Sequence, residues 1–197
     1  MPGLASCSEN MRKSLFIGFL FTFLITVGQG IPDDLPRPVL RELNSQFGKD
    51  EFKVIEKSWD NQANAGEKFF SVESSGKPGI KGYLHIGRVK TCRAGGCSLS
   101  ENSATATEEF DSEYFDYFIL YNSDFSVETV KVYNYQASYG HEISARGWLK
   151  QFEGFAGKSS LEVGKNIDAI SGATVSVYAI TEDVKWKTKL LQEAVQH

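Results

Sequence analysis

The sequence has few residues of the kinds that build metal sites or bind nucleic acid. Its three histidines are His85, His141 and the terminal His197, and its three cysteines include one close pair, Cys92 and Cys97. A structural zinc site needs more ligands than this pair supplies, so we expect no resident metal. Lysine and arginine form no recurring cluster, and the formal net charge is −4. This charge pattern argues against a nucleic-acid phosphate backbone as a partner.

The apolar run near the start of the chain is short for a helix that spans a membrane. It extends from Leu15 to Val27, interrupted only by glycine and threonine, whereas about 20 residues cross a bilayer core. Arg12 and Lys13 precede it and Gly28-Gln29-Gly30 follows it, which is the order of a secretory signal peptide. We therefore predict an exported, periplasmic or otherwise extracytoplasmic protein that starts at Met11 and is cleaved after residue 30. A membrane anchor formed by an uncleaved signal segment is the alternative.

Neither an internal repeat nor a linker rich in proline and glycine divides the 197 residues. Hydrophobic content of 41% is ordinary for a globular chain. We predict a single α+β domain, with an antiparallel sheet and its hairpin packed against helices, and with a C-terminal amphipathic helix. Residues 1–30 hold the upstream residues and the signal peptide, 31–109 the N-terminal part of the mature domain, and 110–197 the region with the candidate site.

Hydrophobic periodicity places the elements of this domain. A helical pattern covers 39–47 and ends near Gly48, and strand-like segments follow at 51–59, 68–72 and 82–89. Residues 114–120 and the β-branched stretch "VETVKVYNY" flank turn residues, which predicts a hairpin. A helix is expected at 143–152. In the last helix, an apolar face of Val177, Ile180, Val184, Leu191 and Val195 leaves Lys185, Lys187 and Lys189 at the other positions.

The stretch "NIDAISGATVS", residues 166–176, is a candidate anion site at the start of the last helix. If Ser171 caps the helix, Gly172, Ala173 and Thr174 form its first turn, where unpaired backbone N–H groups and the helix dipole favour a phosphate. Thr174 is a poor nucleophile unaided, so joining it to a phosphate needs a separate transferase, and Asp168 could hold the metal for that transfer. The alternative is an ordinary helix start beside a favourable carboxylate.

Asp168-Ala169-Ile170-Ser171-Gly172-Ala173-Thr174 resembles the flavinylation motif of the FMN-binding domain family, D-x-x-[ST]-G-A-[ST] before a C-terminal helix. The family includes extracytoplasmic flavin subunits of the sodium-pumping quinone reductase and of the ion-pumping ferredoxin oxidoreductase complex. The resemblance implies that Thr174 carries FMN through a phosphoester bond. It also implies that a flavin transferase installs the FMN from FAD with transient Mg²⁺, and that Asp168, Ser171, Gly172 and Ala173 form the recognised stretch.

The resemblance extends upstream, through the hairpin, to a glycine-containing turn and a helix ending in an aromatic residue and glycine. His141 and Glu142 in that turn could contact the flavin, or could form a solvent-facing salt bridge. The flavin subunits of the pumps typically read E-T-P-G-L-G here, whereas this chain has Gly140-His141-Glu142-Ile143-Ser144-Ala145. The region 110–197 is therefore the predicted FMN-binding region.

Cys92 and Cys97 flank the short stretch Arg93-Ala94-Gly95-Gly96 in a compartment where disulfides persist. A structural disulfide is the favoured interpretation, and a redox-active dithiol near the flavin is the alternative. We predict an exported electron-transfer flavoprotein, a carrier or subunit of a redox system, whose partner is a membrane redox complex or another extracytoplasmic carrier. A flavin-dependent reductase that uses the dithiol and a cofactor-free secreted binding module are the alternatives.

Overall fold

The computed structural model describes residues 30–49, 51–57, 68–76, 79–91 and 113–196. The predicted signal segment with Met11, and the pair Cys92 and Cys97, lie outside these residues. Among the described residues, no helix has both the length and the apolar character needed to cross a membrane.

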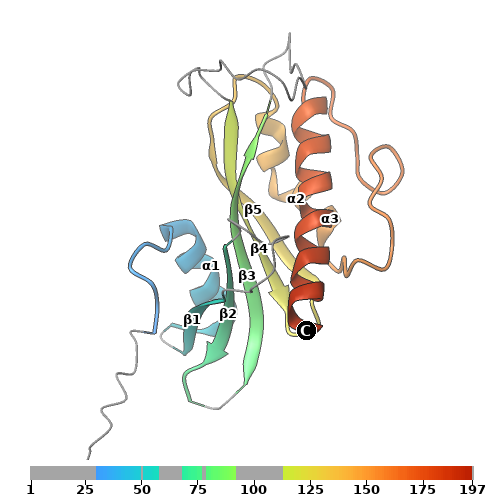
Figure 1. Ribbon diagram of the computed structural model, residues 1–197. Helices are drawn as coiled ribbons and strands as arrows, with labels where there is room; N and C mark the ends of the chain where they lie inside the picture. The colour runs from blue at the N-terminus through green and yellow to red at the C-terminus, as the bar shows by residue number, and fades with distance from the viewer. Residues whose placement is uncertain (1–29, 50, 58–67, 77–78, 92–112, 197) are drawn as a thin grey trace, which may run out of the picture.

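Five antiparallel strands form one sheet in the order β1-β2-β3-β4-β5, so each strand pairs with its neighbour in sequence (Figure 1). The helix α1 precedes the sheet, and α2 and α3 follow it. This architecture confirms the predicted α+β fold and the predicted hairpin. The strands are β1 (Phe52–Lys57), β2 (Lys68–Ser74), β3 (Ile80–Lys90), β4 (Tyr114–Asn122) and β5 (Val127–Tyr135).

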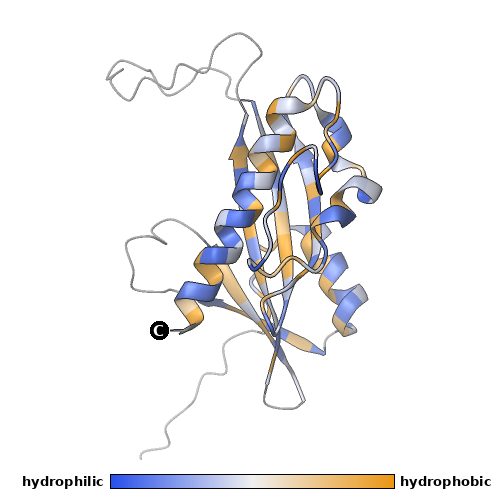
Figure 2. Ribbon diagram, turned by 90° about the vertical axis from the view of Figure 1, so that its right-hand side faces the viewer, coloured by the Kyte–Doolittle hydropathy of each residue, from blue (hydrophilic) through white to orange (hydrophobic). Residues whose placement is uncertain are grey.

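The two faces of the sheet bury two separate hydrophobic clusters. On β4, residues 115, 117, 119 and 121 pack with α3, whereas Phe118 and Leu120 pack with Val39 and Leu43 of α1 (Arg37–Phe47). This alternation follows from the period of two along a strand. Hydrophobic residues accordingly run along the central strands (Figure 2). Helices therefore cover both faces, with α1 opposite α3 (Figure 1).

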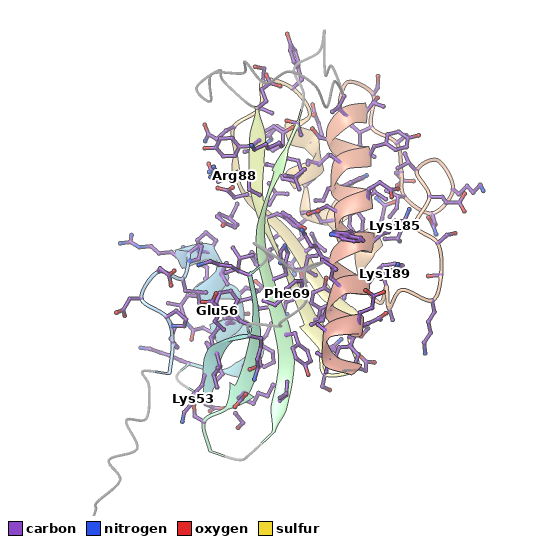
Figure 3. All side chains as sticks on the ribbon, in the orientation of Figure 1. Lys53, Glu56, Phe69, Arg88, Lys185 and Lys189 are labelled. Atoms are coloured by element: carbon purple, nitrogen blue, oxygen red, sulfur yellow. The ribbon has the colours of Figure 1, made fainter. Side chains whose placement is uncertain are left out.

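The last helix, α3 (Thr174–Gln196), matches most of the predicted pattern. Val177, Ile180, Val184 and Leu191 are buried against the sheet, where Phe69 lies between β2 and the helix (Figure 3). Val195 was predicted to share this face but is 37% exposed near the helix end.

Lys187 is buried, although the sequence pattern placed it off the apolar face of α3. Lys185 and Lys189 lie on the outer side of the helix (Figure 3), but Lys187 is only 6% exposed. Its Nζ lies 3.5 Å from Asp183 Oδ1, one turn earlier, and Asp183 accepts a hydrogen bond from the Tyr117 hydroxyl. A lysine can be buried when its charge is paired in this way.

The segment predicted as one helix at 143–152 is helical in three short pieces. A 3₁₀ turn, η2 (His141–Ser144), precedes α2 (Arg146–Leu149) and a second 3₁₀ turn, η3 (Lys150–Phe152). Ala145 adopts an extended conformation (φ −66°, ψ 123°), and this interrupts the helix after its first turn. Trp148, Leu149 and Phe152 are nevertheless buried together, as their spacing predicts.

Candidate functional site

The segment 166–176 enters α3 through a tight turn rather than through a serine cap. The Ala173 N–H bonds the Ile170 carbonyl (3.1 Å), and Gly172 takes a left-handed φ of 82° within this turn. The first helical bond runs from the Val177 N–H to the Ala173 carbonyl (2.9 Å), so Ala173 occupies the cap position. The prediction that Ser171 caps the helix is therefore wrong, because the left-handed Gly172 cannot belong to a right-handed first turn.

Side chains from α2 and η3 hold the backbone of this segment in place. The indole N–H of Trp148 donates to the Asp168 carbonyl (2.9 Å), and the Asp168 N–H donates to Gln151 Oε1 (2.7 Å). Gln151 Nε2 in turn donates to the Trp148 carbonyl (3.0 Å). Ile167 and Ala173 are buried on either side of the exposed turn. The Asp168 side chain itself is exposed, so the fixed part of this residue is its backbone.

A pocket of about 450 Å³ opens beside the start of α3. Thr91 and Glu113 belong to one wall, where the Thr91 N–H bonds the Glu113 carbonyl (2.7 Å) and so extends the pairing of β3 with β4. These strand ends and the first turn of α3 lie together at the upper end of the molecule (Figure 1). The residues lining the pocket are Thr91, Glu113, Tyr139, Gly172, Ala173, Thr174, Val175 and Ser176.

A hydroxyl network ties the segment after β5 to the first turn of α3. The Tyr135 hydroxyl donates to the Tyr139 carbonyl (2.5 Å) and lies 2.8 Å from the Ser176 hydroxyl. Because the single Tyr135 hydroxyl hydrogen goes to Tyr139, Ser176 is the donor in the second bond. Gly140 packs closely against both hydroxyls, at a left-handed φ of 89°. The rim residue Tyr139 is thereby fixed through its backbone, while its side chain is 72% exposed.

The start of α3, rather than the Glu113 wall of the pocket, suits a negatively charged group near Thr174. The first turn of α3 contains no acidic residue, and its N–H groups lie at the positive end of a 23-residue helix. A methyl group built on Gly172 would have no neighbour within 4 Å, so an incoming group can approach the backbone there. Thr174 is exposed, and its side chain is accessible for modification.

A buried polar group lies deeper between the sheet and α3. The His85 ring is fully buried and its Nδ1 lies 3.1 Å from the Lys68 carbonyl. The pKa of His85 is lowered to about 3, mainly by burial and secondly by the charge of Lys187, while the hydrogen bond with the Lys68 carbonyl opposes these effects. His85 is therefore neutral at physiological pH. It is not among the residues that line the pocket.

The structure brings together only part of the predicted site. Gly172, Ala173 and Thr174 line the pocket, whereas Asp168 and Ser171 precede it on the same segment without lining it. His141 and Glu142 lie exposed on η2 and do not line the pocket either. The His141 ring instead packs edge-on against Tyr135, with 5.4 Å between ring centroids.

Sequence reasoning missed five residues that line the pocket. Val175 and Ser176 lie within the stretch 166–176 but were given no role there, and Tyr139 lies two residues before His141, so widening that turn would have found it. Thr91 and Glu113 carry no local signal, because strand pairing brings them to the helix start. Within the described ranges, no group of three or more histidine, cysteine, aspartate or glutamate residues is placed to hold a metal ion.

Comparison with known protein families finds a match for the region around the pocket. Residues 114–186 match the family model of the FMN-binding domain, from the start of β4 into α3. The match confirms the resemblance noted in the sequence, and this part of the chain is similar to the FMN-binding domain. It includes six of the pocket residues, Tyr139 and 172–176, while Thr91 and Glu113 lie outside the matched range. No curated protein matches the chain.

Proposed function

We propose that this FMN-binding domain is an exported electron-transfer flavoprotein whose FMN is attached to Thr174 through a phosphoester bond. The observation that carries the proposal is the position of Thr174. Its side chain is exposed on the wall of the pocket, at the first residue of α3, within the part of the chain that matches the FMN-binding domain. Export is supported by the basic start and apolar run at 12–27.

The residues present fit an FMN molecule. The pocket volume of about 450 Å³ falls within the range of about 300–1,000 Å³ that small-molecule sites occupy. The α3 N-terminus beside Thr174 favours the phosphate, and the open approach at Gly172 leaves room for it. Tyr139 offers an exposed aromatic face, on which a flat ring can stack. The anion site at the start of α3 and the aromatic side chain of Tyr139 therefore both adjoin the same cavity.

Attachment requires a partner enzyme. The Thr174 hydroxyl oxygen would bond the phosphorus of the FMN half of FAD while the pyrophosphate bond to the AMP half breaks. AMP leaves with the electron pair of that bond, and the hydroxyl proton passes to a base of the transferase. A threonine hydroxyl is unreactive unaided, so a flavin transferase with Mg²⁺ supplies this chemistry. The contacts of Trp148 and Gln151 with Asp168 present the segment in one conformation.

Bound flavin accepts and donates electrons, and the chain would position it and control its exposure. Tyr139 and Val175, which are 72% and 51% exposed, form an open rim beside Thr174. A ring held there keeps an edge accessible to a redox partner. We propose a membrane redox complex or another extracytoplasmic electron carrier as that partner.

The test is covalent labelling. The chain is co-expressed with a flavin transferase and separated by denaturing electrophoresis, in which only covalent flavin remains fluorescent in the band. We expect a fluorescent band for the parent and for Thr174→Ser, which keeps a hydroxyl, and none for Thr174→Val, which keeps the shape without it. Equal fluorescence in parent and Thr174→Val would place the bond elsewhere. No fluorescence in the parent, despite a transferase active on a known substrate, would refute attachment.

A further inference from the structure

Thr91 lines the pocket beside α3, and its buried hydroxyl has no use in the fold. Thr91 is 6% exposed, and its Oγ1 has no hydrogen-bond partner within the described part of the chain. A buried hydroxyl without a partner destabilises a folded protein, since water satisfied it before folding. Such a group beside a cavity points to a ligand that supplies the missing bond.

The backbone around Thr91 is held firmly, so its side chain has a defined direction. Lys90 pairs with Tyr114 at the end of the β3–β4 ladder, and the Thr91 N–H donates to the Glu113 carbonyl at 2.7 Å. Val89, two residues earlier, is buried in the cluster beneath α3. Because side chains alternate along a strand, Thr91 and Val89 lie on the same face of the sheet, the face that α3 covers. Thr91 directly follows the last residue of this strand, where it lines the pocket.

Two further residues on this side of the pocket are fixed in the same way. The Glu113 carboxylate accepts a hydrogen bond from the Ser138 N–H (3.2 Å), and the Tyr135 hydroxyl holds the Tyr139 carbonyl (2.5 Å). The exposed Tyr139 side chain therefore projects from a fixed backbone, and it lines the same pocket as the buried Thr91. The Thr91 hydroxyl could form a hydrogen bond with a flavin heteroatom, and the Tyr139 side chain could stack on the flavin ring.

We propose that Thr91 is a flavin-binding residue, whose hydroxyl donates a hydrogen bond to the part of the flavin that lies beyond the phosphate. The proposal rests on the assignment of the pocket to FMN in the preceding section. Thr174 and the α3 N-terminus take the phosphate on one side, and Thr91 meets the remainder on the other. A residue outside the matched range 114–186 thus completes the site.

The experiment measures non-covalent binding to the full chain produced without a flavin transferase. FMN and riboflavin are titrated separately and followed by flavin fluorescence, with equilibrium dialysis as the second readout. Thr91→Val removes the hydroxyl and keeps the shape, and Thr91→Ser keeps the hydroxyl. Because no covalent bond forms under these conditions, the result does not depend on whether Thr174 is the attachment residue.

For Thr91→Val we expect the Kd for FMN to rise by about threefold to tenfold, the effect of one lost hydrogen bond. The same rise is expected for riboflavin, which has no phosphate, while Thr91→Ser stays within about twofold of the parent. Urea unfolding of the flavin-free Thr91→Val protein should show unchanged or greater stability, since the variant removes a buried hydroxyl that has no partner. A structural role for the hydroxyl predicts the opposite.

Three results would overturn the proposal. The first is an unchanged Kd in Thr91→Val for both flavins. The second is a Kd change seen with FMN but absent with riboflavin, which would place the contact at the phosphate. The third is no saturable binding of either flavin to the parent, which would remove the pocket assignment while leaving the covalent-labelling test of Thr174 to be judged by itself.

Discussion

Gly140 follows Tyr139 at the rim of the pocket and packs against Ser176 of α3, and its replacement by alanine tests how much this close packing contributes to stability. A Cβ atom on Gly140 would lie 2.8 Å from the Ser176 hydroxyl and 2.8 Å from the Tyr135 hydroxyl. Both distances are shorter than real Cβ contacts, so one hydroxyl must move. The hydrogen bond between them is then strained or lost. The backbone is also unfavourable for alanine, because φ is 89°.

Gly164 provides a matched control, since it has nearly the same φ of 85° and no atom within 4 Å of a built Cβ. Gly164→Ala should cost about 1 kcal/mol of unfolding free energy, the left-handed strain less the entropy that alanine removes from the unfolded chain. Gly140→Ala should cost about 2–4 kcal/mol, because the hydroxyl bond and the close packing are disturbed as well.

Urea unfolding of the flavin-free proteins gives both free energies. Titration with FMN should separate the two variants further, because displacement of Gly140 also moves the neighbouring Tyr139 at the rim, whereas Gly164 does not line the pocket. Equal destabilisation by the two substitutions would refute the reasoning, since it would mean that the contacts with Tyr135 and Ser176 contribute nothing. A loss of FMN affinity in Gly164→Ala equal to that in Gly140→Ala would refute the local link to the pocket.

Two further predictions concern His85 and Trp148, which lie outside the pocket lining. Burial holds the pKa of His85 at about 3 in the folded protein, whereas its ordinary value is 6.5. The unfolded chain therefore binds a proton below pH 6.5 that the folded protein does not bind, and the free energy of unfolding falls as the pH falls from 6.5 toward 3. Between pH 7.5 and pH 5 the free energy of unfolding should fall by about 2 kcal/mol. Urea unfolding at both pH values should show the loss in the parent and not in His85→Gln, and an undiminished loss in the variant would assign it to other groups. Trp148→Phe removes the donor to the Asp168 carbonyl, so we expect about 1–2 kcal/mol of destabilisation and slower flavin incorporation by the transferase. Incorporation at the parent rate, followed by in-gel fluorescence over time, would show that this contact does not position the segment.

Elements with strong local patterns could be predicted from the sequence. The β4–β5 hairpin and α3 follow from β-branched and aromatic runs around a turn and from a helical apolar face, which depend on neighbours close in the chain. Thr174, Gly172 and Ala173 could be placed in the site for the same reason, since one short motif holds all three. These predictions required no knowledge of how distant segments pack.

The wrong or missing predictions depend on packing between distant segments. Gly172 takes a left-handed φ, so the helix cap is Ala173 and not Ser171, and the same segment is held at Asp168 by Trp148, 20 residues earlier in the chain. Lys187 is buried although its spacing placed it off the apolar face of α3, and its partner Asp183 accepts a hydrogen bond from Tyr117 of the distant strand β4. Thr91 reaches the pocket through the pairing of β3 with β4 and lies more than 80 residues before Thr174 in the chain.

The site combines an exposed Thr174, the proposed attachment residue, with a backbone held in place by its neighbours, and the proposed maturation requires both. A transferase must reach the Thr174 hydroxyl, so this residue and the turn before it are exposed and cannot be held by burial of their own side chains. Their position comes instead from backbone contacts made by Trp148 and Gln151, and from the buried neighbours Ile167 and Ala173. Within the described ranges, the exposed side chains of Asp168, Ser171 and Thr174 make no hydrogen bond to the surrounding residues. It follows that substitutions of Trp148 or Gln151 should slow the attachment of flavin without abolishing it, whereas loss of the Thr174 hydroxyl should abolish attachment.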